Sequence, residues 1–206
     1  MPTPALLRVL ASRRMLVALL MGFASGLPLL LTLSVLQAWM KEEGVDLAVI
    51  GLMALVGLPY TLKFLWAPVL DRYTIPVFGR RRGGLLMAQT ALELAIIALS
   101  ATNPAQHPWL VALAAFWVTF FSASQDIVVD AYRREDLADE ELGLGSSLYI
   151  NGYRTGMLLA SGGGLIMADH IPFSMVYLIM AACLLPGILT TLLTPEPKTP
   201  KGTPQT

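Results

Sequence analysis

The sequence predicts an all-α membrane protein with six transmembrane helices. Of its 206 residues, 55% are hydrophobic and only 14% are charged, whereas soluble domains carry about 25% charged residues. The charges gather in short clusters, and the apolar runs between them have about twenty residues, the length with which a helix crosses about 30 Å of hydrocarbon. The 14 basic residues are balanced by 14 acidic ones, so the chain lacks the basic surplus that a nucleic-acid partner requires.

The first expected span covers residues 15–40. Arg13 and Arg14 precede it, and the small residues around Gly26 are typical of a signal-peptide cleavage site. Because the apolar sequence continues to Met40 and further runs follow, we expect a retained transmembrane helix. Residues 1–14 are then expected to be a cytoplasmic N-terminus.

Five further apolar runs follow, separated by charged clusters. Lys41 lies after the first span, a run of arginines precedes the third, and Arg133 and Arg134 follow the fourth. The later spans are expected at residues 47–70, 84–101, 109–130, 145–168 and 173–194. We therefore expect one six-helix bundle over residues 15–194, followed by a Pro-rich tail or linker over residues 195–206.

The basic residues of the loops predict the orientation of the bundle, because Lys and Arg concentrate on the cytoplasmic side. Eleven of the 14 lie on the side of the two termini, whereas Lys41 lies on the opposite side. Both termini are therefore expected in the cytoplasm. The eleven residues are Arg8, Arg13, Arg14, Arg72, Arg80, Arg81, Arg82, Arg133, Arg134, Lys198 and Lys201.

Ionisable residues inside the spans are candidate functional residues, because a charge at the bilayer centre costs at least about 2.5–3.5 kcal/mol. Lys63 lies about 12 Å along its helix from Asp71, and it either pairs with a carboxylate or belongs to a substrate or proton pathway. Arg154, near the middle of the fifth span, presents a guanidinium fork that suits a carboxylate or phosphate. Nearby, Asn151 offers hydrogen bonds to sugar or peptide groups.

Two carboxylates lie near the end of the fourth span. Asp126 and Asp130 are four residues apart, so they share a helix face, and Gln125 lies beside them. Carboxylates this close repel each other when both are ionised, which favours a bound proton and predicts a protonation switch. For Asp130 the alternative is a simple helix end at the membrane interface. For Glu93, in the middle of the third span, we expect a structural hydrogen bond between helices.

A membrane enzyme is the competing class, with Asp126 and Asp130 as half of a metal-binding carboxylate cluster. The sequence pattern lacks the further carboxylates that such a cluster needs, and His107 and His170 each stand alone. It also lacks a phosphate-binding loop and a Gly-x-Ser-x-Gly motif. We therefore predict no enzyme activity, no catalytic residue and no metal.

The stretch between the second and third spans carries a recognisable pattern of acidic, basic and glycine residues. It resembles the cytoplasmic loop signature of the major facilitator superfamily, with an insertion between its two parts. The resemblance implies a gating loop that clamps helix ends together in one state and releases them in the other. The candidate gating residues are Asp71, Arg72, Gly79, Arg80, Arg81 and Arg82.

Several other strings are similar to the AmpG-type muropeptide permeases, a family within that superfamily. The most specific string covers residues 122–130 and contains Gln125, Asp126 and Asp130. The resemblance extends from about Met15 to Pro197. The other matching strings are residues 22–28, 36–40, 63–68, 78–83 and 152–156.

This resemblance implies one half of a major facilitator superfamily fold, built as a 3+3 inverted repeat. It also implies proton-driven import of anhydromuropeptides, which are GlcNAc-anhydroMurNAc disaccharides with or without peptide, across the bacterial inner membrane for peptidoglycan recycling. The proton gradient would be the driving force, without a cofactor. The implied substrate-binding residues are Lys63, Arg154, Gln125 and Asn151, and the implied proton-coupling residues are Asp126 and Asp130.

The length of the chain departs from this family, whose members carry a second bundle of at least six helices and bind substrate between the two halves. We therefore expect an N-terminal half that works with a C-terminal six-helix half in the same or another chain. The alternatives are a transporter of acetyl-coenzyme A or another anionic solute, or a non-transporting half-bundle or truncated remnant.

Overall fold

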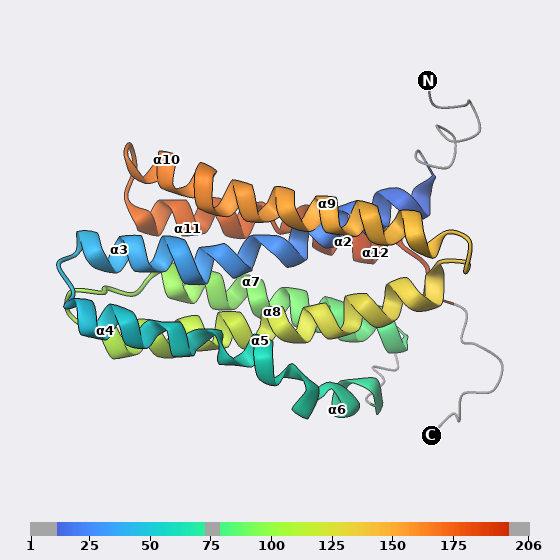
Figure 1. Ribbon diagram of the computed structural model, residues 1–206, viewed down its shortest axis with the longest axis horizontal. Helices are drawn as coiled ribbons and strands as arrows, with labels where there is room; N and C mark the ends of the chain where they lie inside the picture. Colours follow the sequence, from blue (N-terminus) through green and yellow to red (C-terminus); the bar gives the residue numbers. More distant parts are fainter. Residues whose placement is uncertain (1–11, 73–78, 198–206) are drawn as a thin grey trace.

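The computed structural model describes residues 12–72 and 79–197, which form a bundle of helices along one long axis (Figure 1). Most of the N-terminal segment, part of the loop before Gly79 and most of the Pro-rich tail lie outside the described residues, so the expectations for residues 1–11, 73–78 and 198–206 are not addressed by it. The first and last described helices meet at one end of the bundle, where the Arg13 side chain donates a hydrogen bond to the Leu193 carbonyl. We call this end the basic end, because Arg80 and Arg133 also lie there.

The first apolar run forms one continuous rod whose limits exceed the expected span by two residues at each end. A π-helical turn interrupts its regular hydrogen bonding near the middle. The rod consists of α2 (Arg13–Leu30), the π-helical turn η1 (Leu31–Val35) and α3 (Leu36–Glu42).

The second apolar run is broken into short pieces, unlike the regular helix expected from its length. Pro59 and Pro68 cannot donate a backbone hydrogen bond, so the helix cannot remain regular around them. Its last piece diverges from the bundle at the basic end (Figure 1). The pieces are α4 (Leu47–Leu52), the 3₁₀ turn η2 (Met53–Gly57), α5 (Leu58–Leu62), the 3₁₀ turn η3 (Lys63–Leu65) and α6 (Ala67–Arg72).

The remaining runs are helical close to the expected limits. A second π-helical turn, η4, lies in the fifth run, and the sixth run is interrupted just before Pro186. These helices are α7 (Arg80–Ser100), α8 (Pro108–Asp136), α9 (Leu142–Leu158) with η4 (Leu159–Gly163) and α10 (Gly164–Ala168), α11 (Phe173–Ala182) and α12 (Leu185–Leu193).

Five of the described helices are long and apolar enough to cross a membrane. They are Arg13–Glu42, Leu47–Leu65, Arg80–Ser100, Pro108–Asp136 and Phe173–Leu193. The expected fifth span is also helical but is not among these five, because Arg154 and its polar neighbours reduce the hydropathy of that helix. The structure thus confirms an all-helical protein with several candidate membrane spans.

The helix α8 continues six residues beyond the expected end of the fourth span. Two interactions favour this extension. Asp130 and Arg133 form an ion pair of 3.1 Å one turn apart, and basic residues in the last turn of a helix interact favourably with its dipole. The sequence from 131 to 136 is therefore helical, not a loop.

Four glycines bring α2 and α9 into direct backbone contact. Gly22 and Gly26 on α2 face the carbonyl groups of Tyr149 and Tyr153, where even a Cβ atom would overlap the backbone oxygen. Gly152 and Gly156 on α9 face the backbone of α2 in the same way. Small residues at this spacing let helices approach closely in membranes, so the two helices form the tightest pair of the bundle.

Two apolar cores lie along the bundle. The larger one lies towards the end opposite the basic end and includes Leu27, Leu92 and Val118. The smaller one lies at the basic end and is formed by Val17, Met21, Leu85, Val128, Val129, Tyr132 and Tyr149. The helices α2, α7 and α8 contribute residues to both cores. On each of these helices, the residues between its two sets of core residues lie between the two cores along the bundle.

Tyr177 stabilises the π-helical turn η1. Its buried hydroxyl donates a hydrogen bond of 2.9 Å to the Leu31 carbonyl. We expect Tyr177→Phe to lower the free energy of unfolding by about 1–3 kcal/mol, because the buried carbonyl loses its side-chain donor. Thermal unfolding in lipid nanodiscs, followed by tryptophan fluorescence, measures this. Tyr153→Phe, whose hydroxyl makes no hydrogen bond with the described residues, is the matched control, and equal losses in both variants would contradict this role of the hydroxyl.

Candidate functional site

Five buried polar side chains form a layer between the two apolar cores. On α8, the layer lies between Val118 of the larger core and Val128 of the smaller one, and on α7 it lies between Leu92 and Leu85. Each of the five side chains is at most 6% exposed. This polar layer consists of Ser25 on α2, Gln89 on α7, and Ser122, Gln125 and Asp126 on α8.

Gln125 connects two helices inside this layer. Its Nε2 donates a hydrogen bond of 3.2 Å to the Ser25 hydroxyl on α2. Gln89 differs, because neither atom of its buried amide has a hydrogen-bond partner among the described residues. Gln125 is thus placed within the bundle, and its expected contact with substrate stays a prediction.

Asp126 is the acidic member of the polar layer and is 6% exposed. Its Oδ1 is fully buried without a hydrogen-bond partner among the described residues. The charged groups close enough to act on it are Lys63 and Asp130. The structure therefore brings two of the expected site residues, Lys63 and Asp126, together, although no ion pair forms between them in the described part of the chain.

Lys63 is half-buried and begins the 3₁₀ turn η3, where the second apolar run is broken. Side chains of α8 hold this broken region in place. The Trp66 indole donates a hydrogen bond of 3.1 Å to the Ser124 hydroxyl, and the Thr119 hydroxyl donates one of 2.7 Å to the Val56 carbonyl. Backbone irregularity within a membrane is tolerated where neighbouring helices satisfy the freed groups, and here it places a lysine beside the polar layer.

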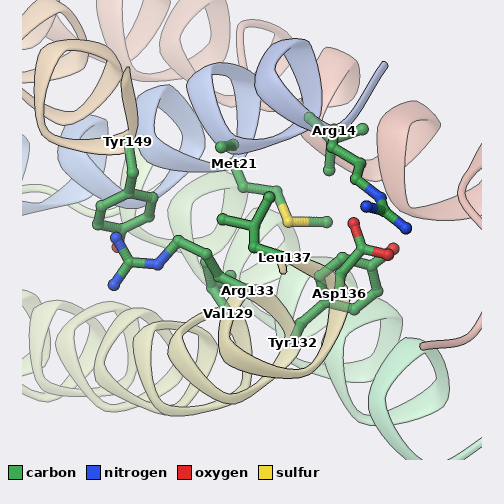
Figure 2. A pocket seen from close by; sticks show the side chains of 10 residues that line it. Arg14, Met21, Val129, Tyr132, Arg133, Asp136, Leu137 and Tyr149 are labelled. Atoms are coloured by element: carbon green, nitrogen blue, oxygen red, sulfur yellow. The ribbon is translucent and has the colours of Figure 1, made fainter. Parts of the chain in front are cut away.

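Asp130 lies outside the polar layer and is exposed. Its partner Arg133 also stacks on the Tyr149 ring, with the guanidinium carbon 4.4 Å from the ring centroid. Figure 2 shows this contact in the pocket between α2, α8 and α9, where Arg14 and Asp136 point towards one another. Asp130 is therefore paired with a neighbour on its own helix, not with Lys63 or Arg154.

Arg154 lies on the exposed face of α9. The opposite face of α9 carries the glycines that contact α2, so the exposed face points away from the rest of the bundle. Asn151 lies on this face, where its Nδ2 donates a hydrogen bond of 2.9 Å to the Ser147 carbonyl. Arg154 has no ion pair or hydrogen bond with any described residue. The exposed polar stripe consists of Ser147, Asn151, Arg154 and Thr155.

Glu93 does not form the expected hydrogen bond between helices with any described residue. It is half-buried on α7, one turn from Gln89, whose amide is also without a hydrogen-bond partner among the described residues. The structural interpretation of Glu93 as a satisfied interhelical contact is therefore wrong for the described part of the chain.

The basic end holds most of the expected gating residues in one ion-pair network. Arg81 pairs with Asp71 at 2.6 Å and with Glu135 of α8 at 2.6 Å, and Arg80 pairs with Glu135 at 2.7 Å. The ends of α6, α7 and α8 are thereby connected. Arg72 is exposed and makes no ion pair with the described residues.

Glu196 binds the first turn of α7 with its carboxylate. The backbone amides of Arg81 and Arg82 donate hydrogen bonds of 2.7 and 2.9 Å to it. Gly79, with φ of +87°, is required at this position, because a Cβ atom there would lie 2.7 Å from the Glu196 carboxylate. In return, the Arg82 side chain donates to the carbonyls of the last turn of α12, at 2.7 Å for Leu192. The negative charge of Glu196 thus lies at the N-terminus of α7, and the positive charge of Arg82 lies at the C-terminus of α12. Each charge is opposite in sign to the partial charge of the helix dipole at that end.

The family model of the Major Facilitator Superfamily matches residues 11–206, nearly the whole chain. The chain belongs to the major facilitator superfamily. Its gating-loop signature is consistent with this membership, and its several apolar helices make it a multi-pass membrane protein.

Relatives within the superfamily also match. The chain is 48% identical to the anhydromuropeptide permease of Escherichia coli (strain K12) over 97% of its length and 41% of the permease. It is 36% identical to the putative transporter AmpG 1 of Rickettsia bellii over 82% of its length and 42% of that protein. The similarity to AmpG-type permeases is thereby confirmed. The chain spans about two fifths of the length of these relatives.

Two carboxylates that bind the candidate gating residues were missed by sequence reasoning. Glu135 and Glu196 are the carboxylates that bind the arginines and the amides of the loop. Glu135 could have been found, because it follows the Arg133 and Arg134 pair at the same end of the bundle as the arginines of the loop. Glu196 lies in a Pro-rich stretch without periodicity, where no local signal indicates a contact.

Proposed function

We propose that the chain is part of a proton-coupled importer of anhydromuropeptides in the bacterial inner membrane. The relatives named as permease and transporters support this proposal. In this proposal the helix over Leu142–Ala168 also crosses the membrane, giving six spans arranged as a 3+3 inverted repeat with both termini in the cytoplasm. The protein acts as a transporter, not as an enzyme.

The observation that carries the proposal is the exposed polar stripe of α9. Arg154 lies about 18 Å along the helix from Leu142, near the middle of the rod that ends at Ala168. An arginine at this depth is too costly to face lipid, so the stripe must face water or protein. A water-filled path lined by a guanidinium and an amide suits a solute with carboxylates, hydroxyls and amides.

Substrate and proton are assigned to different places in this proposal. Arg154 and Asn151 bind the substrate on the exposed face, with Lys63 and Gln125 reaching it from the polar layer. Asp126 takes up the proton, and Asp130 assists it from the basic end. The proton gradient drives transport without a cofactor.

A second six-helix half completes the pathway, in the same or another chain. The exposed stripe supports this, because transporters of this kind hold the substrate between two repeats that rock against each other. The candidate gating residues Asp71, Arg72, Gly79, Arg80, Arg81 and Arg82 then hold the basic end closed in one of the two states.

The test is uptake of labelled anhydromuropeptide by cells that lack their own permease and express this chain with a complementing half. We expect Asp126→Asn to reduce accumulation to background, because the buried carboxyl can no longer exchange a proton, and a protonophore to do the same. The exposed Asp139→Asn is the matched control and should retain uptake. Uptake that resists both Asp126→Asn and the protonophore would overturn proton coupling. If unlabelled acetyl-coenzyme A competes with the uptake and unlabelled anhydromuropeptide does not, the substrate is the other anionic solute.

A further inference from the structure

We propose that Tyr60 and Ser122 complete the Asp126 site, their hydroxyls being the hydrogen-bond partners that position this carboxyl in both its protonated and its ionised form. The inference deepens the proposed function and rests on it, since it assigns two positioning residues to the proton-accepting carboxyl. Ser122 lies in the string 122–130 but was not a candidate site residue there, and Tyr60 lies outside all the matching strings.

Three buried polar atoms without partners meet at this place. The Tyr60 hydroxyl, the Ser122 hydroxyl and Asp126 Oδ1 are all inaccessible to solvent and lack hydrogen bonds with the described residues. Ser122 and Asp126 are four residues apart on α8, so they share one face of the helix. Tyr60 approaches from α5, and the groups acting on its hydroxyl include Ser122 and Asp126.

An unsatisfied polar atom in the interior is uncommon, and a group of three indicates a functional arrangement. All the other buried hydroxyls of the neighbouring turns are used: Ser124 accepts from Trp66, Thr119 donates to Val56, and Ser25 accepts from Gln125. The Val56 and Trp66 contacts place the segment that contains Tyr60 against residues 119–124 of α8, so the two unpartnered hydroxyls, Tyr60 and Ser122, lie in the same region of the bundle.

Hydroxyl groups suit a carboxyl that changes its protonation state. A hydroxyl donates to a carboxylate and accepts from a carboxylic acid, whereas the Lys63 ammonium can only donate. A change of side-chain rotamer that brings one of these hydroxyls within hydrogen-bond distance of Asp126 would thus satisfy the carboxyl in either state. Lys63 supplies charge to the ionised form, and the hydroxyls hold the carboxyl in place when the proton is bound.

Other charged and polar groups of the surrounding helices also act on Asp126. Tyr149 and Tyr153 of α9 are among the residues on which the Asp126 charge acts. The charged and polar groups that act on Asp126 itself are Lys63 of η3, Ser25 of α2 and Asp130 of its own helix. The Tyr60 and Ser122 hydroxyls differ from the polar groups of these five residues. They are fully buried and also have no hydrogen-bond partner in the described part of the chain.

The test is infrared spectroscopy of the purified chain in lipid nanodiscs across a pH titration. The carbonyl stretching band of protonated Asp126 is identified by its loss in Asp126→Asn. We expect Tyr60→Phe and Ser122→Ala each to shift the frequency of this band, because the protonated carboxyl loses a hydrogen-bond partner.

Tyr177→Phe and Ser161→Ala are the matched controls, because their hydroxyls bind the Leu31 and Met157 carbonyls away from the Asp126 site. Both controls should leave the band unchanged. The inference is overturned if the band is unaltered in Tyr60→Phe or in Ser122→Ala, or if Asp126→Asn removes no band at any pH. The infrared measurement does not depend on transport. A failure of uptake in the wild-type protein would therefore overturn the proposed function, whereas an unaltered infrared band would overturn only the role of Tyr60 and Ser122.

Discussion

Replacing Gly26 by valine is expected to push α2 away from α9 and to destabilise the folded bundle strongly. The Cβ position of Gly26 overlaps the Tyr153 carbonyl, which belongs to the backbone and cannot rotate away. Overpacking of a close interface costs about 1–3 kcal/mol and occasionally more, and the three neighbouring glycines leave no room for relief. Thermal unfolding of the purified chain in nanodiscs should show a large drop in midpoint, and uptake in the complemented cells should be lost.

Gly162→Val is the matched control for this substitution. Gly162 lies in η4, the continuation of α9, and its Cβ position has no atom within 4 Å. We expect its unfolding midpoint to stay close to that of the wild-type chain. Equal behaviour of the two variants would show that the backbone contact of α2 with α9 is not what holds the bundle together.

Replacing Arg81 by methionine is the second substitution with a large expected effect. The Arg81 side chain is 10% exposed, and its partner Glu135 is 13% exposed. Removing one partner of a buried ion pair costs about 3–5 kcal/mol, because the remaining charge is left uncompensated. Glu135 keeps only Arg80, so we expect a marked loss of stability and of uptake.

Two further variants separate the ion pair from general effects of charge. Arg134→Met removes a pair with Asp139 whose side chains are 66% and 84% exposed, so it should change stability by less than about 1 kcal/mol. The double variant Arg81→Met with Glu135→Leu should recover part of the stability, because the buried Glu135 charge is removed and only the more exposed Arg80 and Asp71 are left without these partners. A double variant no more stable than Arg81→Met alone would contradict the uncompensated-charge explanation.

The positions of the helices could be predicted from the sequence because the bilayer imposes a length on each apolar run. The first helix was expected at 15–40 and lies at Arg13–Glu42, and the same agreement holds for the third and sixth. The second run shows the limit of this reasoning. Its hydropathy indicates a span, but the breaks around Lys63 depend on where α8 offers hydroxyl and indole partners, which are distant in the sequence.

The candidate site was predicted in its residue types but not in its arrangement. Charge and spacing indicated Asp126 and Arg154, since burial of such groups is costly anywhere in a membrane. The separation of Asp126 in the interior from Arg154 on the exposed face depends on how α9 rotates against α2, which the interlocking glycines decide. The role of Tyr60 could not be predicted, because a tyrosine in an apolar run gives no signal of what its hydroxyl contacts.

The reciprocal capping by Glu196 and Arg82 has a mechanical consequence. The segment after α12 is bound by its carboxylate to the start of α7 and by the Pro195 carbonyl to the Tyr132 hydroxyl of α8. Tension applied to the chain at Pro197 would therefore be transmitted to the first turn of α7 and, through Arg81, to α8, before it reached α12 alone. Residues 195–196 are thus bound to two other helices, so a displacement of this segment would act directly on the helix ends that carry the candidate gating arginines.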